Sequence, residues 1–282
     1  MMPGAPVAEA VLADVTKRVA ALAASGVVPG LGTILVGDDG PSAGYVARKH
    51  ETCEQVGIKS FNIEIPAEAG QAALLEAVDS FNSNPLVDGY LIQHPVPDGF
   101  DFNAALSKMD PAKDADGLHP TNLGRLVLQE PGPVPCTPAG IQAMLEHYGV
   151  ETRGKNAVVV GRGPTLGRPM ALLLSNRGAG ADAAVTVVHS RVENLADYPV
   201  RTTSLIGSGV VNQLSSARHG SKPGAWFNQA ADHMEKARSY FPIVAVVASG
   251  RPWITPSWVQ GQDRHGGDVA AKIRSDAAET QR

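Results

Sequence analysis

The sequence of 282 residues has little cysteine, few aromatic residues and no excess of positive charge. Its two cysteines, Cys53 and Cys136, are too few for a disulfide framework, and no CxxC or His/Cys cluster suggests a metal site. We therefore expect no metal and two reduced thiols, as in a cytoplasmic protein. The formal net charge of −4, without a basic stripe, argues against a nucleic-acid or anionic-membrane partner.

Long apolar runs are also missing. No apolar stretch reaches about 18 residues, and no basic segment followed by an apolar run opens the chain, so we expect neither a membrane span nor a secretory signal. The apolar fraction of 43% is nevertheless near the globular average, and the length suffices for two domains or one large α/β domain. We expect a soluble protein with a substantial core.

Strand and helix patterns alternate along the first half of the chain, which is typical of an α/β fold with parallel strands. Short apolar runs between turn residues predict the strands, and apolar residues at helical spacing predict the helices. The expected strands are 31–36, 60–65 and 87–93, and the expected helices are 8–24, 41–56 and 69–82.

The helix predicted at 41–56 carries a group of polar side chains beside its apolar face. At about 100° per residue, Ser42, Tyr45 and Lys49 fall within an arc of about 60°. Val46 and Cys53 lie beside that arc and should face the core. A hydroxyl, a phenol and an amine at the edge of a buried face are typical of a cleft wall, although a surface helix fits these residues about as well.

Two further polar positions follow in the first half. Gln93 ends a predicted strand before two prolines, at the carboxyl edge where open α/β sheets bind ligands, but a glutamine can also simply end a strand. Asp114 and Asp116 lie in a stretch rich in turn formers, 110–125. One of them could point into a cleft; a plain Asx-turn loop is the alternative.

A new α/β unit begins after the helix predicted at 135–148, for which Thr137 should be the N-cap. The strand 156–160 leads into a GxGxxxG turn, formed by Gly161, Gly163 and Gly167, and then into a helix at 168–175. Strand, glycine-rich turn and helix in this order predict a dinucleotide site, since the glycines let the backbone approach a pyrophosphate at a helix N-terminus. A tight structural turn is the alternative.

The end of the next predicted strand, 184–188, favours NADP over NAD. An acidic residue there would suit the ribose of NAD, but none occurs before Glu193. Ser190, Arg191 and Arg162 instead supply a hydroxyl and two positive charges, which suit a 2′-phosphate. Arg191 could also be an ordinary solvated arginine.

The rest of the chain gives weaker signals. TTSLIGSGVV, at 202–211, could be a strand, the stretch 243–248 should be a buried strand, and 268–281 should be a short terminal helix or a frayed tail.

Together these segments resemble the methylenetetrahydrofolate dehydrogenase/cyclohydrolase family. Each motif is weak alone, but the set occurs in the family's order and is highly specific. The matching segments are SxxYVxxK (42–49), DGYLIQHPVP (88–97), PAKDADGLHPTNLGRL (111–126), PCTPAGI (135–141), GRGPTLGRPMALLL (161–174), VTVVHSR (185–191) and IVAVVASGRPWITPSWV (243–259).

The resemblance implies a two-domain α/β enzyme, usually a homodimer. It implies a catalytic, folate-binding domain at 1–135, a Rossmann-type NADP-binding domain with a parallel sheet at 136–265, and a tail or short helix at 266–282. The implied activity is oxidation of 5,10-methylenetetrahydrofolate with NADP, followed by hydrolysis to 10-formyltetrahydrofolate in one-carbon metabolism.

The resemblance also implies roles for particular residues. Lys49 would be the catalytic lysine and Gln93 its hydrogen-bonding partner, while Tyr45, Asp116 and Ser42 would bind the folate. The implied cofactor-binding residues are Gly161, Arg162, Gly163, Gly167, Ser190, Arg191 and Gly250.

Departures from the family pattern keep an alternative open. The first residues lack an LDGK-like segment, the stretch 199–242 is altered, and the family's PGGVGPMT segment is absent. A catalytically impaired homologue that only binds nucleotide or folate is therefore the second hypothesis. The Tyr45–Lys49 pair of a short-chain dehydrogenase is a third, but there the glycine-rich loop would precede the pair.

Overall fold

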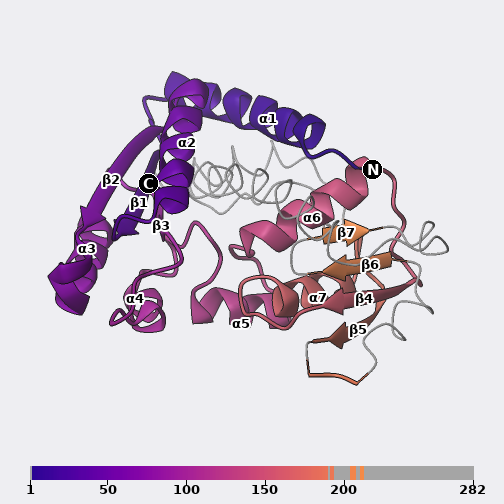
Figure 1. Ribbon diagram of the computed structural model, residues 1–282. Helices are drawn as coiled ribbons and strands as arrows, with labels where there is room; N and C mark the ends of the chain where they lie inside the picture. Colours follow the sequence, from indigo (N-terminus) through magenta and orange to yellow (C-terminus); the bar gives the residue numbers. More distant parts are fainter. Residues whose placement is uncertain (1, 190, 194–203, 208–209, 213–282) are drawn as a thin grey trace.

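The protein contains two β-sheets, each flanked by helices (Figure 1). The computed structural model describes residues 2–189, 191–193, 204–207 and 210–212. In the first sheet the strand order is β2-β1-β3, and in the second it is β5-β4-β6-β7. The predicted two-domain α/β architecture with parallel strands is confirmed.

The first sheet is built around β1, Gly30–Val36, which is buried along its whole length. It pairs in parallel with β2, Lys59–Ile65, and with β3, Gly89–Ile92. A short segment at 113–115 extends the sheet beyond β3. The Tyr90 backbone N–H donates to the carbonyl of Lys113 at 2.8 Å, and the Ala115 N–H donates to the carbonyl of Tyr90 at 3.1 Å.

Helices cover both faces of this sheet because β1 alternates its side chains between them. On one face, Leu31 packs with residues of α1, Ala5–Ala24, and α2, Gly40–Val56. On the other face, the neighbours of Ile34 and Val36 come from α3, Gly70–Ser83, and α4, Phe102–Lys108. A short 3₁₀ helix, Ala67–Ala69, precedes α3.

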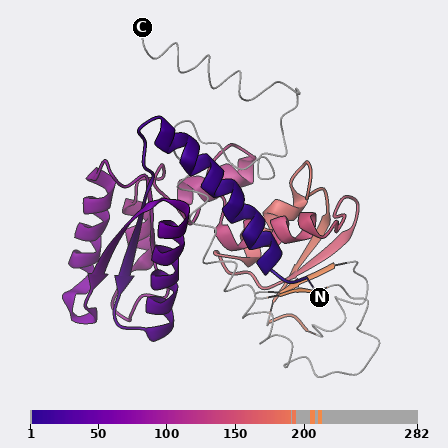
Figure 2. The ribbon, with the colours of Figure 1, turned by 90° about the horizontal axis from the view of Figure 1, so that it is seen from above.

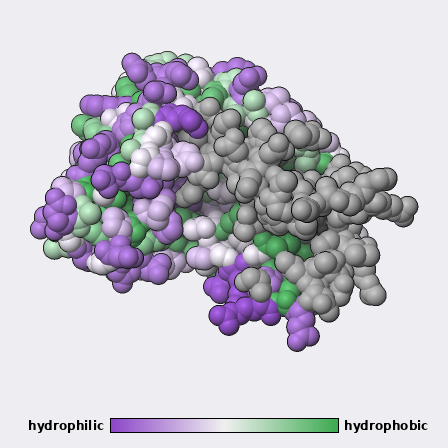
Figure 3. All heavy atoms as spheres, viewed as in Figure 1, coloured by the Kyte–Doolittle hydropathy of each residue, from purple (hydrophilic) through white to green (hydrophobic). Residues whose placement is uncertain are grey.

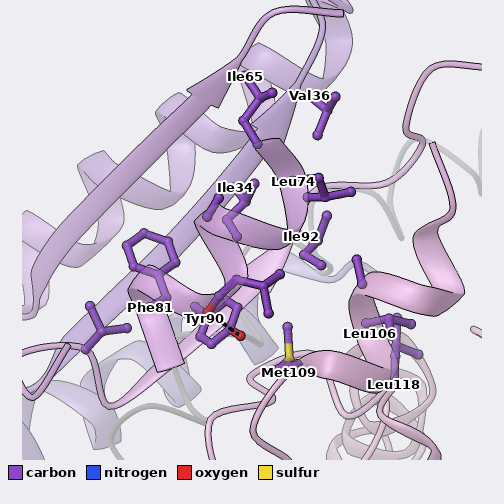
Figure 4. Packing of buried hydrophobic residues seen from close by; sticks show 14 residues of the cluster. Ile34, Val36, Ile65, Leu74, Phe81, Tyr90, Ile92, Leu106, Met109 and Leu118 are labelled. Carbon is purple, nitrogen blue, oxygen red and sulfur yellow. Dashed lines mark hydrogen bonds between the residues drawn. The ribbon is translucent and has the colours of Figure 1, made fainter. Parts of the chain in front are cut away.

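Tyr90 lies at the centre of the core between the first sheet and helices α3 and α4 (Figure 4). Its ring is fully buried, 5.3 Å from the ring of Phe81 between centroids. Its hydroxyl donates to Asn82 Oδ1 at 2.7 Å, which satisfies the one polar atom of the ring. Burial raises the pKa of this phenol, so it stays protonated and acts as a structural group.

The second sheet is parallel except at its last strand. β4, Asn156–Val160, pairs in parallel with β5, Ala184–Val188, and with β6, Ser204–Gly207. β7, Val210–Asn212, pairs antiparallel with β6. The stretch expected as one strand at 202–211 therefore contributes two strands.

Three helices accompany the second sheet: α5, Pro120–Leu128, α6, Cys136–His147, and α7, Gly167–Ser175. Leu126, Ile141 and Met170, one from each helix, share a core with β4 residues.

Helix α1 contacts both α/β units: the first unit, which surrounds the first sheet, and the second unit, which surrounds the second sheet. Figures 1 and 2 show it running from beside the first sheet toward α6. Val15 and Val19 lie in a core of the first unit, whereas Val7 packs with Cys136 and Met144 of α6.

Some boundaries differ from the sequence predictions. The strands at 156–160 and 184–188 are confirmed residue for residue, while β3 is shorter than the expected 87–93. Helices α4 and α5 were not predicted. Thr137 is not the N-cap of α6, because that helix already begins at Cys136, with Pro135 before it. The segments predicted at 243–248 and 268–281 lie outside the described residues.

Hydrophilic residues cover most of the described surface around the first sheet in the view of Figure 3. Within the described part of the chain, no helix combines the length and the apolar character needed to cross a membrane.

The central strand predicts a stability difference between two glycines. A Cβ at Gly32 would lie 2.8 Å from Tyr90 Cβ and 2.9 Å from Phe81 Cε2, so Gly32→Ala should cost about 1–3 kcal/mol through overpacking. A Cβ at Gly124, inside α5, would meet open space, so Gly124→Ala should increase the free energy of unfolding by about 0.5–1 kcal/mol. Urea unfolding of both variants measures the two effects, and destabilisation of equal size would contradict this packing.

Candidate active site

Helix α2 starts where β1 ends, and a cap fixes that start. The Asp39 carboxylate accepts a hydrogen bond from the Ser42 N–H at 2.9 Å, and Pro41 occupies the first turn. Hydrogen bonds from Ser42 lower the pKa of Asp39, so the cap stays ionised. Gly57, at φ 83°, ends the helix in the left-handed conformation.

The polar arc predicted on α2 faces inward. Ser42 is 2% exposed and Lys49 is 4% exposed, while Tyr45 is half-buried. Val46, Cys53 and Val56 are buried beside them, as the helical spacing predicted. The surface-helix interpretation is therefore wrong for Ser42 and Lys49.

Lys49 of α2 binds Gln93, the residue that follows β3. Its Nζ donates to Gln93 Oε1 at 3.1 Å, and both side chains are buried. The amide of Gln93 is itself oriented, because its Nε2 donates to the carbonyl of His94 at 3.0 Å. The backbone N–H of Gln93 donates to the carbonyl of Ile34 at 2.8 Å, which fixes it at the carboxyl end of β3. The amide oxygen is thus held toward the ammonium.

The two aspartates of the 110–119 loop are in different environments. Asp114 is 1% exposed, and its Oδ2 accepts hydrogen bonds from the N–H of His119 at 2.8 Å and from Asn122 Nδ2 at 2.9 Å. Asp116 is half-buried. Of the two, Asp116 is therefore the more accessible to a ligand.

Cys136 links this loop to the first turn of α6. Its Sγ donates to the carbonyl of Ala115 at 3.3 Å, and its N–H donates to the carbonyl of Asp116 at 3.3 Å. Burial raises the pKa of the thiol well above its usual range; the charges of Asp116 and Asp114 raise it further, and that of Lys49 lowers it. The two hydrogen bonds of Cys136 hold the loop against the start of α6.

The glycine-rich turn has the close backbone packing that the sequence predicted. A Cβ at Gly167 would overlap the carbonyl of Gly161, so α7 can begin against the turn only with glycine there. The N–H of Gly161 donates to the carbonyl of Val188 at 2.7 Å, which ties the turn to the end of β5. No side chain caps α7 at Leu166. The start of this helix therefore suits an anion.

Charged side chains lie beside that turn. Arg162 is exposed, with its Nη1 3.1 Å from His189 Nε2, and Arg191 is exposed as well. Gly163 is exposed in the turn. Ser190 and Gly250 lie outside the described residues. Sequence reasoning did not single out His189, although its place directly after β5 was a usable signal.

Among the described residues, no three His, Cys, Asp or Glu side chains are arranged to hold a metal ion.

His50 anchors α2 behind Lys49. Thr33 Oγ1 donates to Asn62 Oδ1 at 2.8 Å, and it lies 3.1 Å from His50 Nε2, from which it can accept. Burial lowers the pKa of His50; Asn62 and the charge of Glu64 raise it, and Lys49 lowers it. The net effect favours the neutral ring in the folded protein.

Comparison with known proteins gives one consistent result. Residues 2–116 match the family described as "Tetrahydrofolate dehydrogenase/cyclohydrolase, catalytic domain", and residues 135–215 match its NAD(P)-binding domain. "Bifunctional protein FolD" of Syntrophotalea carbinolica is 55% identical over 260 residues, which are 91% of this chain and 88% of that protein.

Solved structures agree. The bifunctional FolD enzyme of Campylobacter jejuni superimposes with a TM-score of 0.75 at 28% identity, over 88% of this chain and 97% of that one. The dehydrogenase-cyclohydrolase (FolD) of Trypanosoma brucei, complexed with NADP and an inhibitor, gives 0.69 at 38% identity, over 74% and 72%.

The lowered pKa of His50 predicts a loss of stability in mild acid. Since the folded protein favours the neutral ring, its contribution is complete above the unfolded pKa of about 6.5 and is lost as the pH falls through the lower folded pKa. His50→Gln keeps an amide donor but cannot titrate, so from pH 7.5 to 5.5 its melting temperature should fall less than that of the wild type. Parallel curves for the two proteins would contradict the assignment.

Proposed function

The chain belongs to the tetrahydrofolate dehydrogenase/cyclohydrolase family, and from this premise we propose what its site does. It oxidises 5,10-methylenetetrahydrofolate to 5,10-methenyltetrahydrofolate with NADP and hydrolyses that product to 10-formyltetrahydrofolate, in one-carbon metabolism. The observation that carries the proposal is the buried hydrogen bond from Lys49 to Gln93.

Lys49 acts in the hydrolysis. The methenyl group is a cation, and its hydrolysis needs a water molecule that is oriented and a group that moves protons. The buried amine of Lys49 supplies that group. Gln93 is suited to hold it, because its amide oxygen accepts the hydrogen bond from Lys49 without adding a charge.

Tyr45, Ser42 and Asp116 bind the folate. Hydride transfer depends mainly on how two planar rings are positioned, and an aromatic side chain with an anchoring carboxylate can hold one of them. Tyr45 and Ser42 lie on the same arc of α2 as Lys49, while Asp116 comes from the loop next to β3. The pterin is thereby held from two sides.

The second sheet holds NADP, which accepts the hydride when it is bound. The residues fit this cofactor: Gly161, Gly163 and Gly167 leave room at the uncapped start of α7, which suits the pyrophosphate. Arg162 and Arg191 are exposed cations near the end of β5, where a 2′-phosphate is recognised. We assign Ser190 and Gly250 to the same site from the family resemblance.

We also propose the domain limits, the assembly and the location. The catalytic domain is 1–135 and the NADP-binding domain 136–265, with a tail at 266–282. The protein forms a homodimer in the cytoplasm, as the family resemblance implies. Both cysteines are free and buried, and burial raises the pKa of Cys53 to about 12, which is compatible with a reducing compartment.

The purified chain should form NADPH from methylenetetrahydrofolate and give far less product with NAD. Lys49→Met should abolish the hydrolysis of methenyltetrahydrofolate while leaving NADP affinity nearly intact, because the change lies in the first unit. Lys17→Met, at an exposed position of α1, is the control and should behave as wild type. Absorbance assays measure both steps.

Wild-type hydrolysis by Lys49→Met would remove that lysine from its role. Absence of any turnover by a folded wild-type protein would support the impaired homologue instead, and NADP binding would then be measured directly.

Arg162→Ala should weaken NADP binding by about 1–3 kcal/mol, the scale of a lost charge-assisted hydrogen bond, and should barely change NAD binding. Arg153→Ala is the matched control: that arginine is also exposed, but it precedes β4 at the opposite end of the strand. Calorimetric titration with both nucleotides distinguishes the cases. An equal loss for NADP and NAD would refute the phosphate contact.

A further inference from the structure

Asp114 is a buried carboxyl group that the proposed function does not use. It is 1% exposed, and its Oδ2 accepts two hydrogen bonds, from the N–H of His119 and from Asn122 Nδ2. Its Oδ1 is buried, with no hydrogen-bond partner among the described residues. Burial raises the pKa of this carboxyl, whereas the hydrogen bonds from Asn122 and His119 lower it.

The partners of Asp114 close the loop that contains Asp116. Asn122 is fully buried, and the Nδ2 that donates to Asp114 also donates to the carbonyl of Pro111 at 2.9 Å. Asn122 Oδ1 in turn accepts from Arg125 Nη1 at 3.1 Å. One asparagine at the start of α5 therefore binds both the beginning of the loop and Asp114 in its middle.

Further backbone hydrogen bonds hold the chain around Asp116. Just before it, the segment 113–115 pairs with Tyr90 of β3. Its own carbonyl accepts from the N–H of Cys136. After it, the N–H of His119 donates back to Asp114. The path of the chain on each side of Asp116 thus depends on a bond to Asp114 or to the flanking backbone.

We propose that Asp114 is a positioning residue that holds the 113–119 loop so that the Asp116 carboxylate faces the folate. This inference rests on the proposed function, since Asp116 binds substrate only there. Asp114 itself does not touch the substrate. A carboxyl group suits this place because one of its oxygens can accept the bonds from both His119 and Asn122.

The test is a double-mutant cycle on purified, folded protein. Asp114→Ala should raise the KM for methylenetetrahydrofolate about tenfold and leave the KM for NADP within about twofold. Asp116→Asn should also raise the folate KM. In the Asp116→Asn background, Asp114→Ala should cause no further rise, because it acts through Asp116.

Two further variants separate positioning from general stability. Asp114→Asn keeps an oxygen that can accept both bonds, so its KM for folate should stay close to the wild-type value. This variant also provides the test if the alanine variant does not fold. Asp110→Ala removes a different bond of this loop, from the Ala112 N–H to Asp110 Oδ1, and should lower the melting temperature without a selective change in the folate KM.

Equal losses for folate and NADP, or additive effects in the double variant, would overturn the inference. If the wild-type protein shows no turnover, the proposed function fails separately. The same variants are then titrated with tetrahydrofolate by fluorescence, and wild-type affinity of Asp114→Ala would overturn the positioning role.

Discussion

The hydrogen bond from Lys49 to Gln93 is the constraint on which the rest of the site depends. An ammonium group buried to 4% exposure loses most of its hydration, a loss of several kcal/mol unless polar partners replace the water. The carbonyl of His94 orients the Gln93 amide, and the ladder to Ile34 fixes its backbone. Helix α2 and the end of strand β3 must therefore meet at this point.

The sequence predicted the parts of the fold that depend on local pattern. The arc of Ser42, Tyr45 and Lys49 follows from helical periodicity, and β4 and β5 follow from short apolar runs between turns. Helices α4 and α5 were missed because they are short and lie in stretches rich in turn formers.

The different environments of Asp114 and Asp116 could not be predicted from the residues themselves. Both are aspartates flanking one alanine, and what separates them is a long-range backbone pairing with Tyr90 and a side-chain bond from Asn122. The family resemblance pointed to Asp116 as the ligand-binding residue, but it carried no information on what holds that residue in place. Contacts between elements decide this, and no local spacing encodes them.

Helix α1 gives the molecule a mechanical property. Val15 and Val19 are buried beside the first sheet, while Val7 packs against α6 of the second unit. One helix is therefore held by apolar contacts at both ends. Movement of one sheet relative to the other then requires one of these apolar contacts to slide, and the packing of the side chains resists that movement. Helix α1 therefore limits how far the two sheets can move relative to each other to the small displacements that its valine contacts allow.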